Sequence, residues 1–407
     1  MRIGIVTYSL NVGGVETVME ILANHFSSQK HYIEFVETLS TGEASNHFKE
    51  KGFLVKTITI QVFETRNAFA IRLANALKLY DVLILNNVPF VHYLIGLLKE
   101  ETIVLPILHN DIDEFYKNIL INQQQWDTSI CVSHALEEKF KMMKKIDENK
   151  LITINNGVKV SDIYPKKIEK NFKKIEILFV GRIENQQKGV LLLPEIIQKV
   201  IQDSSDHVHL KVIGEGPSLS LLKKITKASH VEDYISFLGS LKHQQVLKEM
   251  NHADILLMPS YYEGQGLVYL EAMAQGLIPI VSNLKNNTDL VIAHQKNGFL
   301  CPIGDSDAFA KEICYLIQYP EKISKISKEA WKTAHTSLSS NVMAQKYINL
   351  ISDLKKNRKI IRSHTLIKIP YGNLPQFLFQ SLNLLVKVKN KLYQITHKRK
   401  RKYTYGT

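Results

Sequence analysis

The sequence predicts an α/β protein made of two Rossmann-like halves, each with a doubly wound parallel sheet. Short apolar runs of strand length alternate with segments of helical periodicity, which favours parallel sheets. The alternation occurs twice, before and after a polar, charged segment near the middle of the chain. The length of 407 residues also exceeds one ordinary domain, so we expect two domains of about 150 to 200 residues.

The first half, residues 1–160, is predicted to be one Rossmann-like domain. It begins with a β-rich run from Arg2 to Thr7, a Gly-Gly loop and a helical pattern. Gly13 and Gly14 would let this loop and the helix N-terminus approach a phosphate, although a plain turn explains the pair equally well. Further strands are expected at 33–39, 55–60, 82–85, 103–108, 129–132 and 151–154.

The second half, residues 175–338, follows a predicted linker at 161–174 that contains Pro165 and several charges. A closing helix at 339–357 and a basic tail at 358–407 complete the predicted organisation. Two such halves place ligands in the crevice at the carboxyl ends of both sheets. Strands are expected at 175–180, 209–213, 235–238, 255–258 and 278–282, and helices near 191–202, 219–228, 244–251 and 308–318.

The three cysteines, Cys131, Cys301 and Cys314, lie far apart without a C-x-x-C pair. This spacing indicates neither a disulfide framework nor a zinc site, and it suits a reducing cytoplasm. The first strand is too short for the core of a signal peptide. The apolar stretch from Val88 to Leu98 is about half of the ~20 residues that a membrane span needs. We therefore expect no transmembrane helix.

The stretch from Asp254 to Pro279 reads as a buried strand, a glycine loop and a helix. This arrangement directs free backbone N–H groups and a positive dipole end at an anion or a sugar hydroxyl. Glu263 stands before the loop, and Glu271 stands on the second turn of the expected helix. The two carboxylates therefore bracket a candidate ligand site.

Arg182 and Lys188 follow the first strand of the second half, in the sequence V-G-R-I-E-N-Q-Q-K-G. A planar guanidinium and a point-charged ammonium suit a diphosphate and can hold a leaving pyrophosphate without metal. The alternative is a solvated basic loop. The G-E-G-P loop at 214–217 ends another strand, and a plain turn explains it equally well in isolation.

His109 ends the strand predicted at 103–108 and so faces the predicted crevice. A lone histidine is more often structural than catalytic, and its place at a strand end improves the catalytic case. Asp111 and Asp113 form a D-x-D pattern of the kind that holds a divalent cation. The residues after them look like the start of a helix with acidic N-terminal residues, so we expect no metal.

Together these motifs resemble the retaining glycosyltransferases of family 4. The resemblance covers residues 1 to about 350, and its most specific part is the E-x7-E block of Glu263 and Glu271 with Arg and Lys upstream. The contributing motifs are V-G-R and K-G at 180–189, G-E-G-P at 214–217, F-L-G at 237–239, E-G-x-G-L-V-x-L-E-A-M-A at 263–274, G-G-V-E at 13–16, S-H-A at 133–135 and N-N-G-V at 155–158.

The resemblance implies the GT-B fold, in which two facing Rossmann-like domains hold a nucleotide-sugar donor mainly on the second. Arg182 and Lys188 would then hold the donor diphosphate, and Glu271 would accept hydrogen bonds from the ribose. The loop of Gly13 and Gly14 would approach the phosphates from the first domain. Contacts to the donor sugar would come from His109, Glu263, Gly264, Gln265, Gly266, Leu267 and Val268.

The nucleobase would lie between the loops 214–216 and 237–241, which contain Gly214, Gly216 and Leu238. Gln265 departs from the family pattern, which commonly has Phe at this position, and this leaves the selection of the donor sugar open. The family resemblance assigns catalysis to Arg182, Lys188, Glu263 and His109, with no cofactor and no required metal.

The net charge of +13 comes from the tail, because residues 354–407 contain fourteen Lys or Arg and no Asp or Glu. Residues 376–402 combine an apolar face at 3 and 4 spacing with lysines and a K-R-K-R-K cluster. This pattern suits an anionic membrane surface, and a disordered or body-packed tail is the alternative. No recognisable module for nucleic acid is present.

The function expected from the sequence is a retaining, metal-independent hexosyltransferase with a same-face mechanism. It would move a hexose from a UDP-sugar to a cell-surface glycan or lipid-linked precursor, as in capsule or other polysaccharide biosynthesis. Its expected place is the cytoplasmic, inner face of the plasma membrane. A UDP-sugar epimerase of the same fold and a nonenzymatic nucleotide-sugar or nucleic-acid binding protein are the alternatives. The sequence leaves the oligomeric state open.

Overall fold

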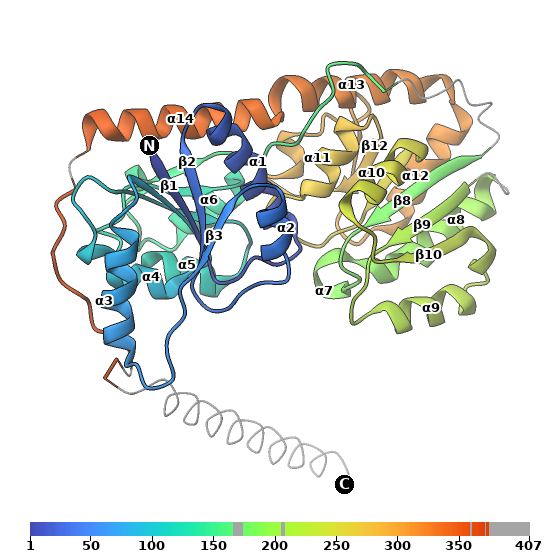
Figure 1. The fold of residues 1–407 in the computed structure, drawn as a ribbon. Helices are drawn as coiled ribbons and strands as arrows, with labels where there is room; N and C mark the ends of the chain where they lie inside the picture. Colours follow the sequence, from blue (N-terminus) through green and yellow to red (C-terminus); the bar gives the residue numbers. More distant parts are fainter. Residues whose placement is uncertain (166–173, 205–207, 359, 371, 374–407) are drawn as a thin grey trace, which may run out of the picture.

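The computed structural model describes residues 1–165, 174–204, 208–358, 360–370 and 372–373. They form two α/β domains side by side, each a parallel sheet with helices on both faces (Figure 1). The predicted fold class, two Rossmann-like doubly wound domains, is confirmed.

The first domain contains a seven-stranded sheet in the order β3-β2-β1-β4-β5-β6-β7, and every pair is parallel. The sheet turns back on itself at β1, which is the arrangement of a doubly wound fold. Its strands are β1 (Arg2–Thr7), β2 (Tyr32–Glu37), β3 (Leu54–Thr57), β4 (Val82–Asn86), β5 (Ile103–Leu108), β6 (Ser129–Cys131) and β7 (Leu151–Thr153), and its helices are α1 (Gly14–Ser28), α2 (Ser45–Glu50), α3 (Arg66–Leu77), α4 (Pro89–Leu94), α5 (Asp113–Leu120) and α6 (His134–Met142).

The second domain repeats the pattern with six parallel strands in the order β10-β9-β8-β11-β12-β13. Its first strand, β8, again stands beside a strand that comes later in the chain, β11. The strands are β8 (Ile175–Val180), β9 (Val208–Ile213), β10 (Ile235–Gly239), β11 (Ile255–Met258), β12 (Ile278–Ser282) and β13 (Phe299–Cys301), and the helices are α7 (Asn185–Lys188), α8 (Leu193–Ser204), α9 (Leu219–Ala228), α10 (His243–His252), α11 (Leu267–Ala274), α12 (Ser306–Gln318) and α13 (Glu321–Ser337).

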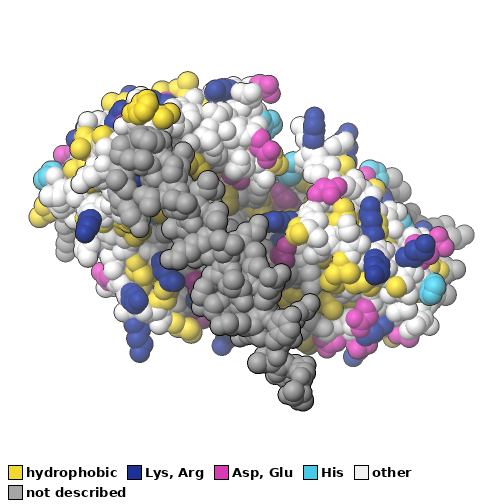
Figure 2. Space-filling view, turned by 90° about the horizontal axis from the view of Figure 1, so that it is seen from below, with side chains coloured by type: hydrophobic (Ala, Val, Ile, Leu, Met, Phe, Trp, Pro, Cys, Tyr) yellow, Lys and Arg dark blue, Asp and Glu magenta, His cyan; other side chains and the backbone are white. Residues whose placement is uncertain are grey.

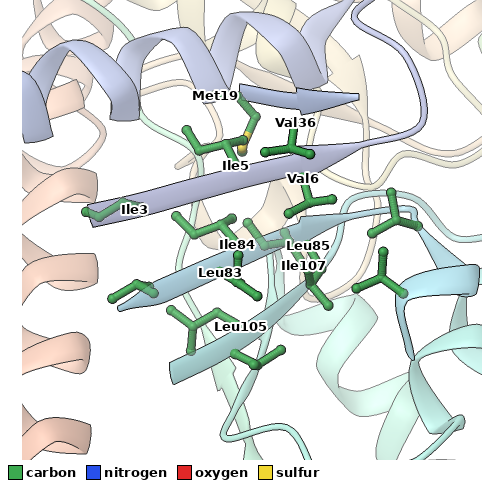
Figure 3. Close-up of a cluster of buried hydrophobic side chains, with 14 of the residues drawn as sticks. Ile3, Ile5, Val6, Met19, Val36, Leu83, Ile84, Leu85, Leu105 and Ile107 are labelled. Carbon is green, nitrogen blue, oxygen red and sulfur yellow. The ribbon is translucent and has the colours of Figure 1, made fainter. Parts of the chain in front are cut away.

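Apolar runs without alternation form the central strands because helices cover both faces of each sheet. In the first domain, Ile3, Ile5, Leu83 and Ile84 are fully buried, and Met19 of α1 packs over β1 (Figure 3). Two predicted strands run furthest past their observed ends, since 33–39 was expected where β2 is Tyr32–Glu37, and 55–60 where β3 is Leu54–Thr57. The partner strand β2 ends at Glu37, opposite Thr57, so the residues beyond have no strand to pair with.

The chain passes between the two domains twice, and the two connecting segments lie side by side. Val158 N donates to Leu338 O at 2.9 Å, and Ser340 N donates to Val158 O at 2.8 Å, so the outgoing and returning segments are paired. Helix α14 (Ser340–Asn357) then runs along the first domain (Figure 1) and buries Tyr347 and Ile351 in its core. Residues 166–173 of the predicted linker lie outside the described residues.

The C-terminal strap, residues 358, 360–370 and 372–373, continues from α14 along the first domain. Arg358 Nε donates to Asp127 Oδ1 at 2.5 Å, and the buried Arg362 donates to Thr102 O at 2.5 Å. Arg66 donates to Pro370 O at 3.2 Å near the far end of the strap. The first part of the predicted tail is therefore packed on the first domain. The predicted amphipathic segment 376–402 lies outside the described residues.

None of the helices in the described part of the chain has the length and apolar character that crossing a membrane requires.

Candidate active site

Gly13, Arg182 and Glu263 follow strands at which a sheet reverses its order, whereas His109 follows β5, one strand beyond the reversal between β1 and β4. In the first domain, Gly13 follows β1 and His109 follows β5, and in the second domain Arg182 follows β8 and Glu263 follows β11. Ligands of doubly wound sheets bind at these carboxyl ends, next to the reversal. Figure 2 shows the molecule hollowed between its two lobes, with acidic and basic side chains on the walls.

The sequence predicts Arg182 and Lys188 in one loop, but Lys188 is the last residue of the single-turn helix α7. The two carboxylate oxygens of Glu184 accept hydrogen bonds from Gln186 N and Gln187 N of this turn, at 2.6 and 3.0 Å. Gly189 ends the turn with φ of 61°, and a Cβ there would stand 2.1 Å from Pro259 O. The K-G dipeptide thus lets α7 pack directly against the chain that leaves β11.

Lys188 and Glu263 form an ion pair that closes this contact. Lys188 Nζ donates to Glu263 Oε1 at 2.6 Å, and Ser260 Oγ donates to the same oxygen at 2.8 Å. The side chain of Glu263 is 5% exposed and that of Lys188 18% exposed. The predicted phosphate-binding cation and the predicted sugar-binding carboxylate are therefore already partners, which the sequence did not indicate.

Arg182 is exposed one residue beyond Gly181, and its neighbours are the glycine loops predicted to hold the nucleobase. Ile183 N donates to Glu215 O at 2.8 Å, which places the G-E-G-P loop directly beside the V-G-R loop. Gly214 N donates to Gly239 O at 2.8 Å, so the loop after β10 completes the row. Leu238, at the end of β10, is 37% exposed. The structure thus brings Arg182, Gly214, Gly216 and Leu238 together.

Glu271 lies on α11 and already has a partner in His243, the first residue of α10. His243 Nε2 and Glu271 Oε1 are 2.8 Å apart, and this hydrogen bond raises the pKa of His243. Glu20 and Lys51 of the first domain also act on His243 through their charges, in opposite directions. Glu271 therefore stands at the boundary between the two domains.

The glycine loop from Gly264 to Gly266 lies against the first domain. A Cβ at Gly264 would stand 1.9 Å from His109 O, so only glycine allows this approach of the two backbones. Gly14, the first residue of α1, has Leu267 as its nearest neighbour from the second domain. The glycine loop and the Gly-Gly loop therefore belong to one interdomain region.

His109 is buried, and its Nε2 lies 2.9 Å from Asn86 Oδ1. Burial without a charged partner lowers the pKa of His109 to about 4, because desolvation disfavours the imidazolium form. The ring is therefore neutral near pH 7. Because Asn86 Oδ1 accepts the one N–H of the neutral ring, Nδ1 is left as a hydrogen-bond acceptor, and the ring holds no positive charge for a phosphate.

Asp111 and Asp113 form ion pairs with a lysine, Lys139, which the D-x-D pattern did not indicate. Lys139 Nζ lies 2.7 Å from Asp111 Oδ1 and 3.1 Å from Asp113 Oδ1. A single ammonium thus serves both carboxylates of the D-x-D pattern. Across the described ranges, no group of three or more His, Cys, Asp or Glu residues is arranged to hold a metal ion.

Gln265 is buried with its side chain turned toward the domain junction. Its Oε1 accepts a hydrogen bond from Asn156 N at 2.5 Å, within the N-N-G-V motif. The residue that departs from the family pattern therefore ties the glycine loop to the crossing between domains.

Sequence reasoning missed Ser260, His243 and Asn287, which contact Glu263, Glu271 and the backbone of the glycine loop. The sequence could have indicated Asn287 as a site residue, because the polar pair N-N follows β12 at the same sheet edge as Glu263.

Residues 160–333 match the family described as Glycosyl transferases group 1. N-acetyl-alpha-D-glucosaminyl L-malate synthase of Bacillus anthracis is 24% identical over 394 residues, covering 88% of this chain and 98% of the relative. Alpha-monoglucosyldiacylglycerol synthase of Acholeplasma laidlawii is 30% identical over 151 residues, which is 37% of each chain.

Two solved structures share the fold at low identity. Anabaena HepE in complex with UDP-glucose superposes with a TM-score of 0.72 at 17% identity, covering 87% of this chain and 100% of the other. S. aureus TarM in complex with UDP gives 0.73 at 14% identity, covering 86% and 99%. The GT-B fold is confirmed, and the matches support a glycosyltransferase activity.

Proposed function

We propose that this chain is a retaining glycosyltransferase that moves a hexose from a UDP-sugar to a cell-surface glycan or lipid-linked precursor. The observation that carries the proposal is the Lys188–Glu263 pair at the sheet reversal of the second domain, opposite His109 of the first. This pair puts a cation and a carboxylate beside a glycine loop in the interdomain hollow. A nucleotide sugar has the matching groups, a diphosphate and a ring of hydroxyls.

The proposed chemistry depends on charge stabilisation at the leaving group. As the bond between the anomeric carbon and the phosphate oxygen stretches, negative charge grows on the diphosphate and positive charge on the sugar. Arg182, Lys188 and backbone N–H groups stabilise the diphosphate, which is the usual way such sites lower a barrier. The departing phosphate oxygen accepts the acceptor's proton on the same face, so the new bond keeps the configuration of the old one.

Glu263 is assigned to the donor sugar as a hydroxyl acceptor. Its Oε1 is already occupied by Lys188 and Ser260, so Oε2 is the oxygen that remains for a sugar hydroxyl. A nucleophilic role would require this carboxylate beneath the anomeric carbon. The neutral His109 contributes a hydrogen bond near the sugar.

The acceptor and the cellular place are also part of the proposal. The similar proteins include a synthase named for a monoglucosyldiacylglycerol and a synthase named for an N-acetylglucosaminyl L-malate. We assign a lipid-linked or glycan acceptor because the tail beyond the strap has the charge pattern of a membrane-binding segment. We also propose that the enzyme acts on the cytoplasmic face of the plasma membrane, without a required metal or cofactor.

The test is incubation of the full chain with a panel of UDP- and GDP-sugars and candidate acceptors. Release of the nucleoside diphosphate with a glycosylated product of unchanged anomeric configuration, read by NMR, supports the proposal. Formation of an isomeric sugar without any acceptor identifies an epimerase instead. Binding with no turnover of any donor would leave the nonenzymatic alternative and refute the proposal.

A further inference from the structure

The buried side chain of Asn287 holds the backbone of the glycine loop. Its Nδ2 donates to Glu263 O and to Gly264 O, each at 2.9 Å, and the residue is 4% exposed. Asn287 N donates to Asp289 Oδ1 at 3.0 Å, and also to Leu284 O at 3.1 Å, which fixes the residue in its own turn. One amide group thus clamps two consecutive carbonyls of the loop that carries Glu263.

The clamp determines where two N–H groups point. In a trans peptide the N–H is directed opposite to the C=O of the same unit. Because the carbonyls of Glu263 and Gly264 point at Asn287, the N–H groups of Gly264 and Gln265 point away from it. Neither N–H has a hydrogen-bond acceptor among the residues that the structure describes. Both therefore lack an acceptor within the described protein, and an oxygen of a bound ligand would satisfy them.

The neighbour Asn286 contacts the first domain. It adopts a left-handed conformation with φ of 57°, its carbonyl accepts from Ala135 N at 2.9 Å, and its side chain donates to Glu138. Ala135 and Glu138 lie on α6. Two consecutive residues therefore bind different partners, the first domain through Asn286 and the glycine loop through Asn287.

We infer that Asn287 is a positioning residue that presents the N–H groups of Gly264 and Gln265 to the donor, and that Asn286 ties this arrangement to the closed position of the domains. The inference rests on the proposed function and deepens it. Preorganised N–H groups act on charge that develops in the transition state, so their loss lowers kcat more than donor binding. Separation of the domains would break the Asn286 contacts next to the clamp.

The experiment compares variants of the full chain by steady-state kinetics and by calorimetry with UDP. Asn287→Ala and Asn287→Asp remove the amide donor, and we expect kcat to fall by about 100-fold, the scale of losing a transition-state hydrogen-bond donor, with the acceptor KM unchanged. Asn287→Gln keeps an amide and should recover part of this loss. Asn283→Ala, an exposed residue of the same segment, is the matched control and should behave as wild type.

Asn286→Gly tests the proposed role of Asn286 in domain closure. Glycine tolerates the left-handed backbone, so the substitution removes only the side-chain contact with Glu138. We expect the donor KM to rise several-fold with kcat nearly unchanged, since fewer molecules occupy the closed arrangement. An unaltered donor KM and kcat in this variant would refute the proposed link between Asn286 and the closed position of the domains.

The clamp itself is overturned if the Asn287 variants keep the wild-type kcat, even when their unfolding temperature falls. If Asn287→Ala fails to fold, the isosteric Asn287→Asp removes the amide donor in its place, and Asn287→Gln remains the variant that keeps an amide. A wild-type chain that turns over no donor refutes the proposed function instead. In that case, calorimetry with an intact UDP-sugar tests the clamp, because the N–H groups would contact the donor: its affinity should fall in the Asn287 variants, and unchanged affinity in every variant would overturn the clamp.

Discussion

Lys188 Nζ and Glu263 Oε1 lie 2.6 Å apart and join the loops that follow β8 and β11, the two adjacent strands at which the second sheet reverses. The pair fixes the ammonium before a donor arrives, and it offsets part of the positive charge at the same time. Arg182 is exposed, and its guanidinium supplies positive charge for a diphosphate. The two cations, which the sequence grouped together, therefore differ before a donor binds: Lys188 is paired with Glu263, and Arg182 is exposed to solvent.

The first prediction concerns this ion pair. Lys188→Met should lower the free energy of unfolding by roughly 3 kcal/mol, because it leaves a buried carboxylate without its cation. Adding Glu263→Gln should recover most of the stability, since the amide needs no charge partner. Activity should fall by about 100-fold or more in kcat/KM for the single variant and should not recover in the double variant.

Urea denaturation and donor turnover of the four proteins in this cycle separate the two roles. Ser260→Ala is a useful control, because it removes the other hydrogen bond to Glu263 Oε1 and leaves the cation in place. Recovery of turnover together with stability in the double variant would contradict a leaving-group role for Lys188.

The second prediction concerns Arg182. Arg182→Ala should change the free energy of unfolding by less than about 0.5 kcal/mol, as exposed side chains usually do. Its kcat/KM should still fall by about 100-fold, the scale of losing a transition-state donor. Arg182→Lys should recover part of the activity, because an ammonium keeps the charge but not the planar fork. Near-normal turnover of both Arg182→Ala and Lys188→Ala would refute stabilisation of the diphosphate.

The fold could be predicted from the sequence because its signals are local and repeated. Apolar strands alternate with helices twice, and the glycine loops mark strand ends, so the sequence alone predicts both sheets. The end of β3 was missed because it depends on where its neighbour β2 stops, which periodicity within one segment does not show.

The site could be predicted as a set of residues but not as a set of contacts. Glu263, Lys188 and His109 were named from motifs, whereas their partners Ser260 and Asn86 come from other parts of the chain or have no motif of their own. Lys139 lies 28 residues from Asp111, and no spacing rule joins the two. Such pairings follow from the packing of helices on sheets, which the sequence specifies only as a whole.

The third prediction is a loss of stability in mild acid. Burial lowers the pKa of His92 and of His109 to about 4, against an ordinary value of 6.5. Between these two pH values the unfolded chain binds protons that the folded chain does not, so stability falls as the pH falls from 6.5 to 4. The slope is at most about 1.4 kcal/mol per pH unit for each histidine.

Denaturation curves at several pH values across this window provide the measurement. His109→Gln should remove the contribution of His109 to the pH dependence, so the free energy of unfolding of this variant should change less with pH than that of wild type. His230→Gln, at an exposed position, should keep the wild-type slope. Equal slopes for His109→Gln and wild type would show that His109 does not stay neutral across this window.

The fourth prediction concerns metal. Lys139 already serves Asp111 and Asp113, so we expect turnover to survive extensive treatment with a chelator. Asp113→Asn should likewise leave kcat within about two-fold of wild type, as expected of an exposed side chain outside the chemistry. Activity lost on chelation and restored by Mg²⁺ or Mn²⁺ would contradict a metal-independent reaction.

The fifth prediction concerns the tail, whose attachment point is now defined. The strap ends on the first domain, where Asn67 N donates to Gly372 O at 2.9 Å and Asn67 Nδ2 to Asn373 Oδ1 at 2.7 Å. A chain cut after Asn373 keeps these contacts and the buried Arg362, whereas an earlier cut would disturb the first domain. The full chain should bind vesicles that contain anionic lipid, and the shortened chain should not.

Vesicle flotation tests this with the two chains at matched concentration. Each nearby cation contributes about 1 kcal/mol at an anionic surface, so changing the five residues of the K-R-K-R-K cluster to Gln should weaken binding strongly. Binding of the full chain should also fall as salt is raised, because exposed charges are screened. Vesicles of neutral lipid provide the control. Equal flotation of the chain cut after Asn373 would place the membrane contact elsewhere on the protein. If the shortened chain loses turnover on lipid-linked acceptors and keeps it on soluble acceptors, the tail contributes to the delivery of the acceptor.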